Sequence, residues 1–197
     1  MNLFRRSPAV PPAPPQPPGP DEWTPEGLLV RVRFANLAGA RVLLYARSLN
    51  DGPASSEHGI HCLGCTGTWT MTTGPSSYPL DFFDGREKAN EHAGQCRALP
   101  GPLPGRPDDE TAIGILTTRI AGAQRDHEFS LYVSDFTGDR VRLQRTDIWI
   151  HEQLAAIADR RPDLLAVTTD TTSSGTTHVY HQVQPRPSTR TRATAAR

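Results

Sequence analysis

The sequence predicts an α+β protein built from two small modules, each combining a helix with short antiparallel strands. Residues 28–34 alternate between apolar and polar positions, as a half-buried strand does. Residues 146–160 begin with a capping residue and continue with helically spaced apolar residues. Between these segments, four prolines fall within residues 100–110, which favours a linker. We therefore expect a first module over residues 26–100, a linker over 101–110 and a second module over 111–183.

Both ends of the chain are predicted to lie outside the fold. Eight of the 19 prolines fall within the first twenty residues, and such a stretch favours extended polyproline II over a packed core. We expect residues 1–24 to be a disordered, proline-rich tail. Residues 184–197 are expected to be a second disordered tail, rich in arginine and free of acidic residues.

Charge and cysteine content exclude several classes of protein. The formal net charge is zero, so no global field attracts the protein to nucleic acid or to a membrane. No apolar region follows Arg5 and Arg6, which argues against a signal peptide. No run of about 18 apolar residues predicts a membrane span. The three cysteines do not form the even set of a secreted disulfide framework, so we expect a soluble protein in the reducing cytoplasm.

The first module is expected to contain two paired strands and one helix. Residues 28–34 and 41–49 form the strands, because both are rich in β-branched and aliphatic residues. The helix is expected over 85–99. Asp84 precedes it as an N-cap, and Glu87 stands in the capping-box position three residues later.

The second module is expected to alternate helices with hairpins, and no internal repeat is evident. Thr146 or Asp147 is expected to cap one of the helices. In chain order, the expected elements are a helix over 111–124, a hairpin of 128–136 and 140–145, a helix over 148–160 and a hairpin of 164–172 and 176–183.

All three cysteines belong to one pattern with a histidine, C-x2-C-x26-H-x3-C, formed by Cys62, Cys65, His92 and Cys96. Two residues between the first two cysteines allow a tight turn that brings both sulfurs to one point, and Gly64 lets the backbone turn there. His92 and Cys96 are four positions apart, so they lie on one face of the predicted helix. Sulfur and nitrogen donors in a tetrahedral set suit Zn²⁺, and we predict a zinc site.

Two alternatives to this ligand set remain open. A redox Cys-x-x-Cys pair would need a βαβ context and would leave His92 and Cys96 unexplained. His58 and His61 lie next to the first two cysteines, and either is an alternative to His92 as a ligand. Four protein ligands leave no open coordination position, which favours a structural over a catalytic zinc.

A family resemblance rests on the segment from Ile60 to Pro100. HCLGC (61–65) and the helix of the type ANEHAGQCRAL (89–99) resemble the zinc-finger-like segment of small uncharacterised actinobacterial proteins, some of them found near phages and plasmids. The resemblance implies zinc at the three cysteines and His92 and a soluble cytoplasmic protein. It implies no established activity.

Arginine supplies 20 of the 21 basic residues. Four arginines are expected on the polar faces of strands, where they would offer a phosphate-binding platform; a solvated sheet face is the simpler interpretation. Three arginines of the C-terminal tail would add phosphate contacts. The first group is Arg31, Arg33, Arg140 and Arg142, and the second is Arg186, Arg190 and Arg192.

No motif predicts an enzyme or a small-molecule substrate. His151-Glu152 lacks the second histidine of a zinc-protease helix, because position 155 is Ala155. The sequence thus favours a non-enzymatic zinc-binding protein that acts by binding nucleic acid or a protein partner. The alternatives are a protein–protein adaptor with no nucleic-acid role, and an enzyme with an unrecognised site in residues 111–183.

Overall fold

The fold was examined in a computed structural model that describes residues 18–48, 56–73, 77–122, 130–172 and 175–183. It is an α+β fold with one four-stranded and one three-stranded antiparallel sheet, which confirms the predicted class. No helix of the described residues is long and apolar enough to cross a membrane. The two predicted tails, 1–24 and 184–197, lie outside the described residues, except for 18–24.

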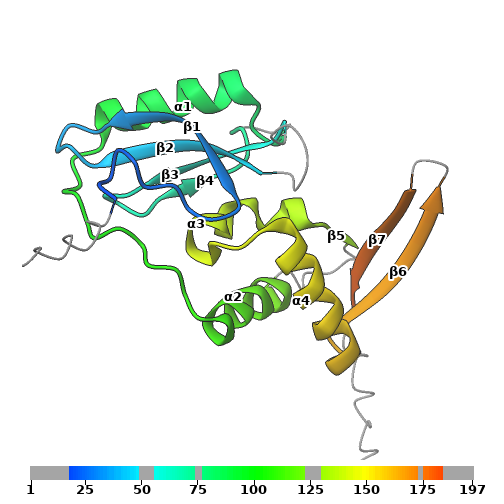
Figure 1. Cartoon of the computed structure of the whole chain (residues 1–197). Coiled ribbons are helices and arrows are strands. Elements are labelled where there is room, and N and C mark those ends of the chain that lie inside the picture. The colour runs from blue at the N-terminus through cyan, green and yellow to red at the C-terminus, as the bar shows by residue number, and fades with distance from the viewer. Residues whose placement is uncertain (1–17, 49–55, 74–76, 123–129, 173–174, 184–197) are drawn as a thin grey trace, which may run out of the picture.

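The first sheet has the order β1-β2-β3-β4 and is covered on both faces. Helix α1 lies across one face, while α2, α3 and α4 lie on the other side of the sheet (Figure 1). Because β2 is central and covered from both sides, its five inner residues are all buried. The strands are β1 (Leu28–Ala35), β2 (Arg41–Arg47), β3 (His58–Cys62) and β4 (Thr68–Trp69).

Strand β1 contains a bulge that changes which face its side chains cover. The register with β2 shifts between Val30 and Val32, so Arg31 is the extra residue of the bulge. Leu28 and Val30 consequently pack with the core cluster on the side of α3, and Val32 packs with the cluster under α1. The predicted strand is present, but its apolar residues serve two faces instead of one.

Helix α1 (Phe82–Gln95) starts earlier than predicted and packs through small residues. Its N-cap is Asp81, whose side chain accepts a hydrogen bond from the backbone N–H of Asp84. Asp84 therefore lies inside the first turn, and the predicted cap at this residue is wrong. Three buried small residues four positions apart, Gly85, Ala89 and Ala93, let the helix approach the sheet closely.

In the second half of the chain, the described residues form three α-helices and the smaller sheet, whose order is β5-β7-β6. The predicted final hairpin is confirmed, and Thr146 caps α4 by accepting a hydrogen bond from Trp149 N–H. The elements are α2 (Asp109–Gly122), β5 (Ser130–Leu131), the 3₁₀-helix η1 (Val133–Asp139), α3 (Arg140–Leu143), α4 (Asp147–Arg160), β6 (Leu165–Thr172) and β7 (Gly175–Gln182).

The predicted hairpin of residues 128–136 and 140–145 is wrong. Apart from the short strand β5, the described part of this segment is helical or irregular. Local hydrogen bonds explain the difference: Asp135 accepts from Tyr132 N–H at 2.7 Å, and the Thr137 hydroxyl donates to the Ser134 carbonyl at 2.6 Å. Such side-chain hydrogen bonds satisfy backbone groups that would otherwise pair with a neighbouring strand.

The two predicted modules pack against each other. A shared core cluster combines Leu43 and Tyr45 of β2 with Val141 of α3. Trp23, which the sequence places in the N-terminal tail, is 8% exposed and belongs to the same cluster. The proline-rich segment 101–110 therefore connects two halves that share a core.

A buried ion cluster also joins the halves. The Asp147 carboxylate of α4 accepts hydrogen bonds from Arg140 of α3 and, at 2.6 Å, from Arg47 of β2. Arg140 is fully buried, and burial lowers its pKa to about 10, an effect that the neighbouring Asp147 opposes. Arg140 also donates to the Arg145 carbonyl at 3.0 Å. One carboxylate thus forms ion pairs with arginines from both halves of the chain.

The Tyr45 hydroxyl provides a direct test of this packing. Tyr45 is fully buried and donates to the Thr137 carbonyl at 2.9 Å. We expect Tyr45→Phe to lower the free energy of unfolding by about 1–2 kcal/mol, because a buried carbonyl loses its partner. Urea denaturation measures this change. Tyr78→Phe is the control: Tyr78 is 53% exposed, and an equal loss there would contradict the prediction.

Candidate metal centre

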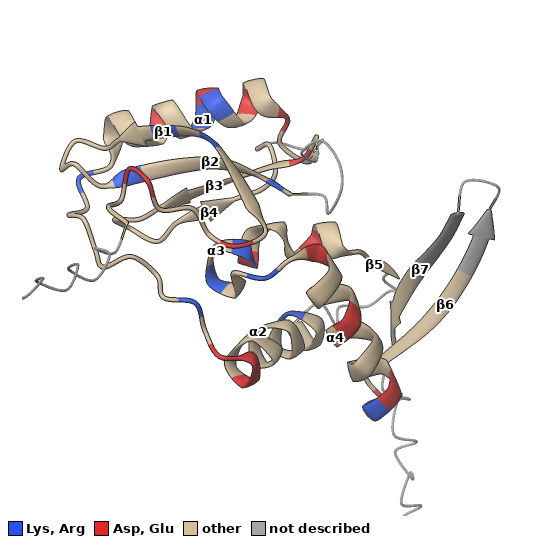
Figure 2. Ribbon diagram, viewed as in Figure 1, with Lys and Arg blue, Asp and Glu red and all other residues tan. Residues whose placement is uncertain are grey.

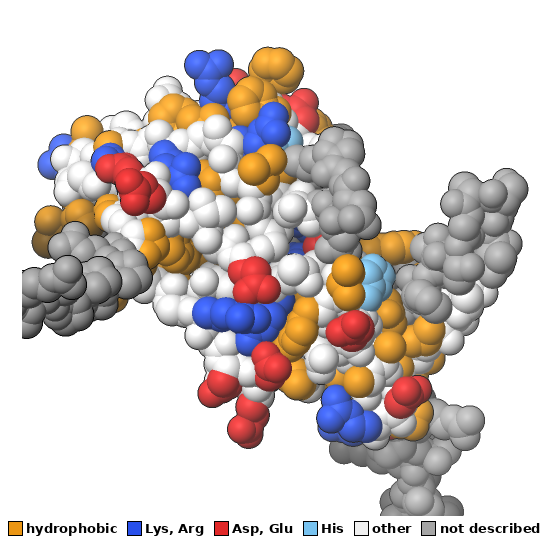
Figure 3. All heavy atoms as spheres, in the orientation of Figure 1, with side chains coloured by type: hydrophobic (Ala, Val, Ile, Leu, Met, Phe, Trp, Pro, Cys, Tyr) orange, Lys and Arg blue, Asp and Glu red, His pale blue; other side chains and the backbone are white. Residues whose placement is uncertain are grey.

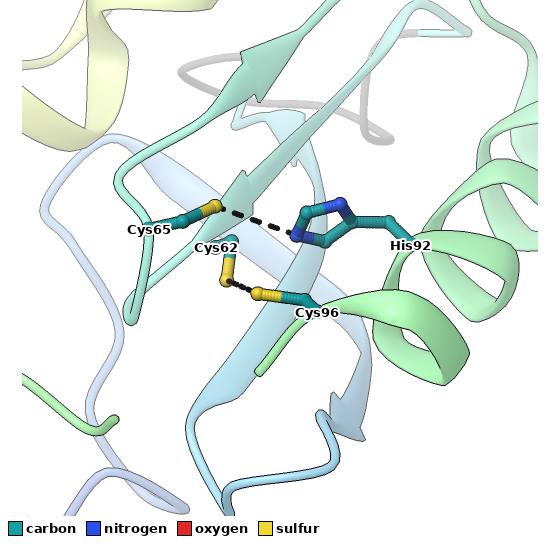
Figure 4. Close-up of side chains that lie close together, drawn as sticks. All are labelled: Cys62, Cys65, His92 and Cys96. Atoms are coloured by element: carbon teal, nitrogen blue, oxygen red, sulfur yellow. Dashed lines mark hydrogen bonds between the residues drawn. The ribbon is translucent and has the colours of Figure 1, made fainter. Parts of the chain in front are cut away.

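Cys62, Cys65, His92 and Cys96 converge at one end of α1 (Figure 4). Their candidate ligand atoms all lie within 4.8 Å of one another, and this arrangement can hold a metal ion. Cys62 ends β3, and Cys65 lies in the turn that follows. His92 belongs to the last turn of α1, and Cys96 is its C-cap. The four residues thus join the strand end to the helix end.

The turn after β3 is closed by backbone hydrogen bonds around Cys62. The carbonyl of Cys62 accepts from Thr66 N–H at 2.9 Å, and its own N–H donates to the Gly67 carbonyl at 3.0 Å. Thr66 has a φ of 58° and so supplies the left-handed residue of the turn. Two cysteines three positions apart therefore direct their sulfurs to the same side.

Two of the distances within the cluster are close to those around a tetrahedral ion with sulfur and nitrogen ligands. Two sulfurs bound at about 2.3 Å from a tetrahedral zinc are separated by about 3.8 Å, and a sulfur and a nitrogen by about 3.6 Å. The Cys62 and Cys96 sulfurs lie 3.9 Å apart, and the Cys65 sulfur lies 3.5 Å from His92 Nε2. The Cys62–Cys96 distance is also about twice that of a disulfide bond, and all three cysteines are free.

Asn36 is a supporting residue that the sequence analysis missed. Its side-chain amide donates to the Cys96 sulfur at 3.3 Å and to the Ala98 carbonyl at 2.8 Å. The backbone N–H of Ala98 and the amide of Asn36 lower the pKa of the Cys96 thiol. Hydrogen bonds of this kind orient metal ligands and stabilise thiolates. Asn36 lies sixty positions before Cys96, so no local pattern identifies it.

Burial of Cys62 disfavours its charged thiolate form. Burial raises the pKa of its thiol to about 11, although the N–H groups of Cys65 and Gly64 oppose the effect. A bound divalent cation would supply the charge that makes the buried thiolate favourable. On the exposed side, the Trp69 ring lies 4.6 Å from the His92 ring. An aromatic side chain from β4 thus covers one side of the cluster.

His58 and His61 do not contribute to the cluster. Cys62 lies under α1 with Val42, its partner in β2. His61 is the preceding residue of the strand and points to the opposite face; its Nδ1 lies 2.8 Å from the Thr68 hydroxyl. The His58 ring contacts Phe82, the first residue of α1, whereas the cluster lies at the last turn.

Position 64 needs a glycine because its neighbours leave no room for a Cβ atom. The backbone conformation is not the reason, since the φ of Gly64 is not in the left-handed region. A Cβ atom there would lie 2.9 Å from the Ala98 carbonyl oxygen and 2.9 Å from the Ala40 Cβ. We expect Gly64→Ala to cost about 1–3 kcal/mol by overpacking and to weaken metal binding roughly 10-fold or more by moving Cys65. Denaturation and a competitive chelator titration measure both effects.

Gly94 offers the matched control for this substitution. It lies in α1 between two ligands, and a Cβ there would meet nothing within 4 Å. We expect Gly94→Ala to leave metal affinity unchanged and to stabilise the protein by about 0.4–1 kcal/mol, because the unfolded chain loses freedom. Equal effects of the two substitutions would contradict the packing argument.

The predicted arginine platform does not form as a unit. Arg140 lies in α3 and is fully buried against Asp147, so its placement on an exposed strand face is wrong. Arg33 is half-buried and donates to the Trp23 carbonyl at 3.0 Å. Arg31 is exposed above the Phe82 ring, and Arg142 is exposed beside Asp139. Arg186, Arg190 and Arg192 lie outside the described residues.

The second half contains an open cleft of about 360 Å³ between α4 and the final hairpin. The Tyr180 hydroxyl donates to the His151 carbonyl at 3.1 Å, and burial raises the pKa of Tyr180. Glu152 and Asp159 also line the cleft. Sequence reasoning did not join these residues, because the cleft forms only when α4 and β7 come together.

Comparisons with known proteins returned no match. No family model, no curated protein and no solved structure matches this chain. The resemblance to actinobacterial zinc-finger-like proteins therefore stays a prediction.

Proposed function

We propose that this chain is a non-enzymatic zinc-binding protein, with a structural site of three cysteines and one histidine, that acts by binding a macromolecular partner. The convergence of the four ligand atoms within 4.8 Å is the observation that carries the proposal. Three thiolates and an imidazole favour zinc over magnesium or calcium, which prefer oxygen ligands. Thiolate ligands fit the reducing cytoplasm, where we place the protein.

The position of the site supports a structural role. The four residues come from the end of β3 and the end of α1, two elements that also share an apolar core. A bound zinc would fix the last turn of α1 to the turn after β3. Four protein ligands would fill its coordination shell and leave no position for a reacting water.

Nucleic acid is the first partner that we propose. Arg31 and Arg142 have exposed side chains, and the segment 184–197 adds four arginines and no acid. On the face in Figure 3, basic side chains form separate groups, many beside acidic ones. Binding would therefore be weak and would depend on the arginine-rich segment more than on a folded basic patch.

Fluorescence anisotropy with labelled DNA and RNA oligonucleotides tests this partner. We expect affinity to fall steeply with salt and to be lost when residues 184–197 are removed, because counterion release drives binding. Arg142→Ala should lower the salt slope by about one unit if this side chain contacts phosphate, whereas the control Arg160→Ala should not. Absence of salt-dependent binding would reject nucleic acid as the partner.

A protein partner is the second candidate, and exposed apolar side chains favour it. Phe83 is 74% exposed and lines an open groove with Phe34, Arg86 and Glu87. Exposed aromatic residues with an arginine are typical of binding hot spots. A protein–protein adaptor would bind its partner with a dissociation constant that changes little with salt concentration. Phe83→Ala would raise that dissociation constant.

The enzyme alternative has a definite location, the cleft lined by His151, Glu152, Asp159 and Tyr180. Its carboxylates belong to exposed residues, which is unlike the desolvated acids of many catalytic sites. Activity against a panel of hydrolase substrates, abolished by Tyr180→Phe with the fold retained, would reverse the non-enzymatic assignment.

A further inference from the structure

The hairpin of β6 and β7 projects from the body of the protein (Figure 1). Its eight residue pairs run without a register shift from Leu165 with Gln182 to Thr172 with Gly175. Strand β5 adds only two pairs at the base, to His181 and Tyr180. Beyond that point the sheet has two strands, and a two-stranded ribbon is only marginally stable in water.

The outer edge of β6 is the longest uninterrupted sheet edge among the described residues; the outer side of β7 is unpaired only over residues 175–179. Strands β4 and β5 have two residues each. Strand β1 is long, but a bulge at Arg31 interrupts it, and bulges and charges at edges prevent further pairing. Strand β6 has eight residues and a continuous register; Asp170 is its one charged residue, and it contains no proline, lysine or arginine. Ala166, Val167, Thr168 and Thr169 are all exposed.

We propose that the edge of β6 pairs in antiparallel fashion with β6 of a second copy of this chain. A two-fold axis near Thr168, the middle of the strand, would bring each donor of one copy opposite an acceptor of the other. The two sheets would join into one of six strands. Each ribbon would then gain the third strand that its distal half lacks.

The chemistry of the ribbon favours a second copy over nucleic acid. Neither strand contains a lysine or arginine, and Figure 2 accordingly shows no blue on the described part of the ribbon. A ribbon that binds a DNA groove needs cations for phosphate contacts. Threonine and valine are instead residues that favour strand pairing, and an edge of this composition is complementary to itself.

The extent of the edge sets the expected affinity. Eight residues span about 27 Å of strand, which is less contact than a standard interface provides. We expect a reversible dimer with a dissociation constant in the micromolar range, so the oligomeric state should change with concentration. Val167 is 38% exposed and would become covered at the centre of the interface.

Sedimentation velocity of the full chain tests this proposal over concentrations from about 1 to 300 μM, a range that brackets micromolar dissociation. The double variant Val167→Lys, Thr169→Lys places lysines opposite lysines across the axis. We expect it to raise the dissociation constant at least 10-fold, because like charges opposite each other destabilise strand pairs. The matched control Val167→Thr, Thr169→Val adds no charge to the strand and should still dimerise.

Hydrogen exchange of the unaltered chain provides a second measurement, which does not depend on folding of the variant. Amides of β6 should be protected at high concentration and exchange faster on dilution, while those of β2 stay protected throughout. A monomer at every concentration overturns the proposal. So does a dimer that the lysine variant forms as tightly as the unaltered chain, or β6 protection that requires added nucleic acid.

Discussion

Removing the metal should produce the largest effect on this protein. We expect one zinc per chain, and we expect its chelation to lower the melting temperature by more than about 10 °C. Isolated zinc-finger peptides gain about 10–16 kcal/mol from their metal. Here the gain should be smaller, because α1 keeps an apolar core with the first sheet when the ion is absent. Even a loss of roughly 5 kcal/mol corresponds to such a shift at this chain length.

Metal analysis, thiol titration and calorimetry check this prediction together. Before chelation the three thiols should be unreactive, and after chelation all three should react. Hydrogen exchange should rise most in the turn 62–67 and in the last turn of α1. Freely reactive thiols in the protein as purified, with no bound metal, would reject the zinc site.

Substitutions separate metal loss from core damage. Cys62→Ser and Cys65→Ser should both abolish zinc binding, but Cys62→Ser should destabilise the protein further, because Cys62 is fully buried and Cys65 is exposed. His92→Cys should retain the metal, since four thiolates also bind zinc. Gln95→Ala is the control on the same helix turn, where the exposed side chain contacts only Glu91 among the described hydrogen bonds, and it should change nothing.

The second large effect is expected at Asp147. Asp147→Asn should lower the free energy of unfolding by about 3–5 kcal/mol, because it leaves the buried Arg140 without a counter-charge. Arg47 would lose its partner at 2.6 Å and keep only Glu57 at 3.9 Å. Chemical denaturation measures the loss, and the two halves of the chain should then unfold in separate transitions if this cluster holds them together.

Asp163→Asn provides the matched control. The Asp163 carboxylate forms an ion pair with Arg161 at 2.8 Å, but both side chains are more than half exposed. Exposed pairs of this kind are worth about 0–1 kcal/mol. If Asp147→Asn and Asp163→Asn lowered the free energy of unfolding by similar amounts, the argument that burial makes the Asp147 ion pairs important would be contradicted.

The sequence predicted the elements whose signals are local. The alternating residues of β1, the capping Thr146 of α4 and the strands of the final hairpin all depend on neighbours within a few positions. The metal cluster was predictable for the same reason, because Cys62 and Cys65 share one turn, and His92 and Cys96 share one turn of helix.

The predictions that failed depended on distant contacts. Whether Arg140 faces water or the interior is decided by Asp147 and by Arg47, which lies almost a hundred residues away in the chain. The segment 130–145 has strand-like composition, but its own side chains satisfy its backbone in a helical turn. A strand forms only where a partner strand supplies hydrogen bonds, and composition does not reveal that partner.

The sequence by itself therefore determined the fold class, the final hairpin and the four residues whose side chains form a cluster that can hold a metal ion. Only the tertiary structure decided that the two halves share a core, that Asn36 supports Cys96, and that β6 presents an uninterrupted edge. The physical reason is the range of the interactions. Caps, turns and periodicity act over a few residues, whereas burial and charge pairing depend on which distant segments meet.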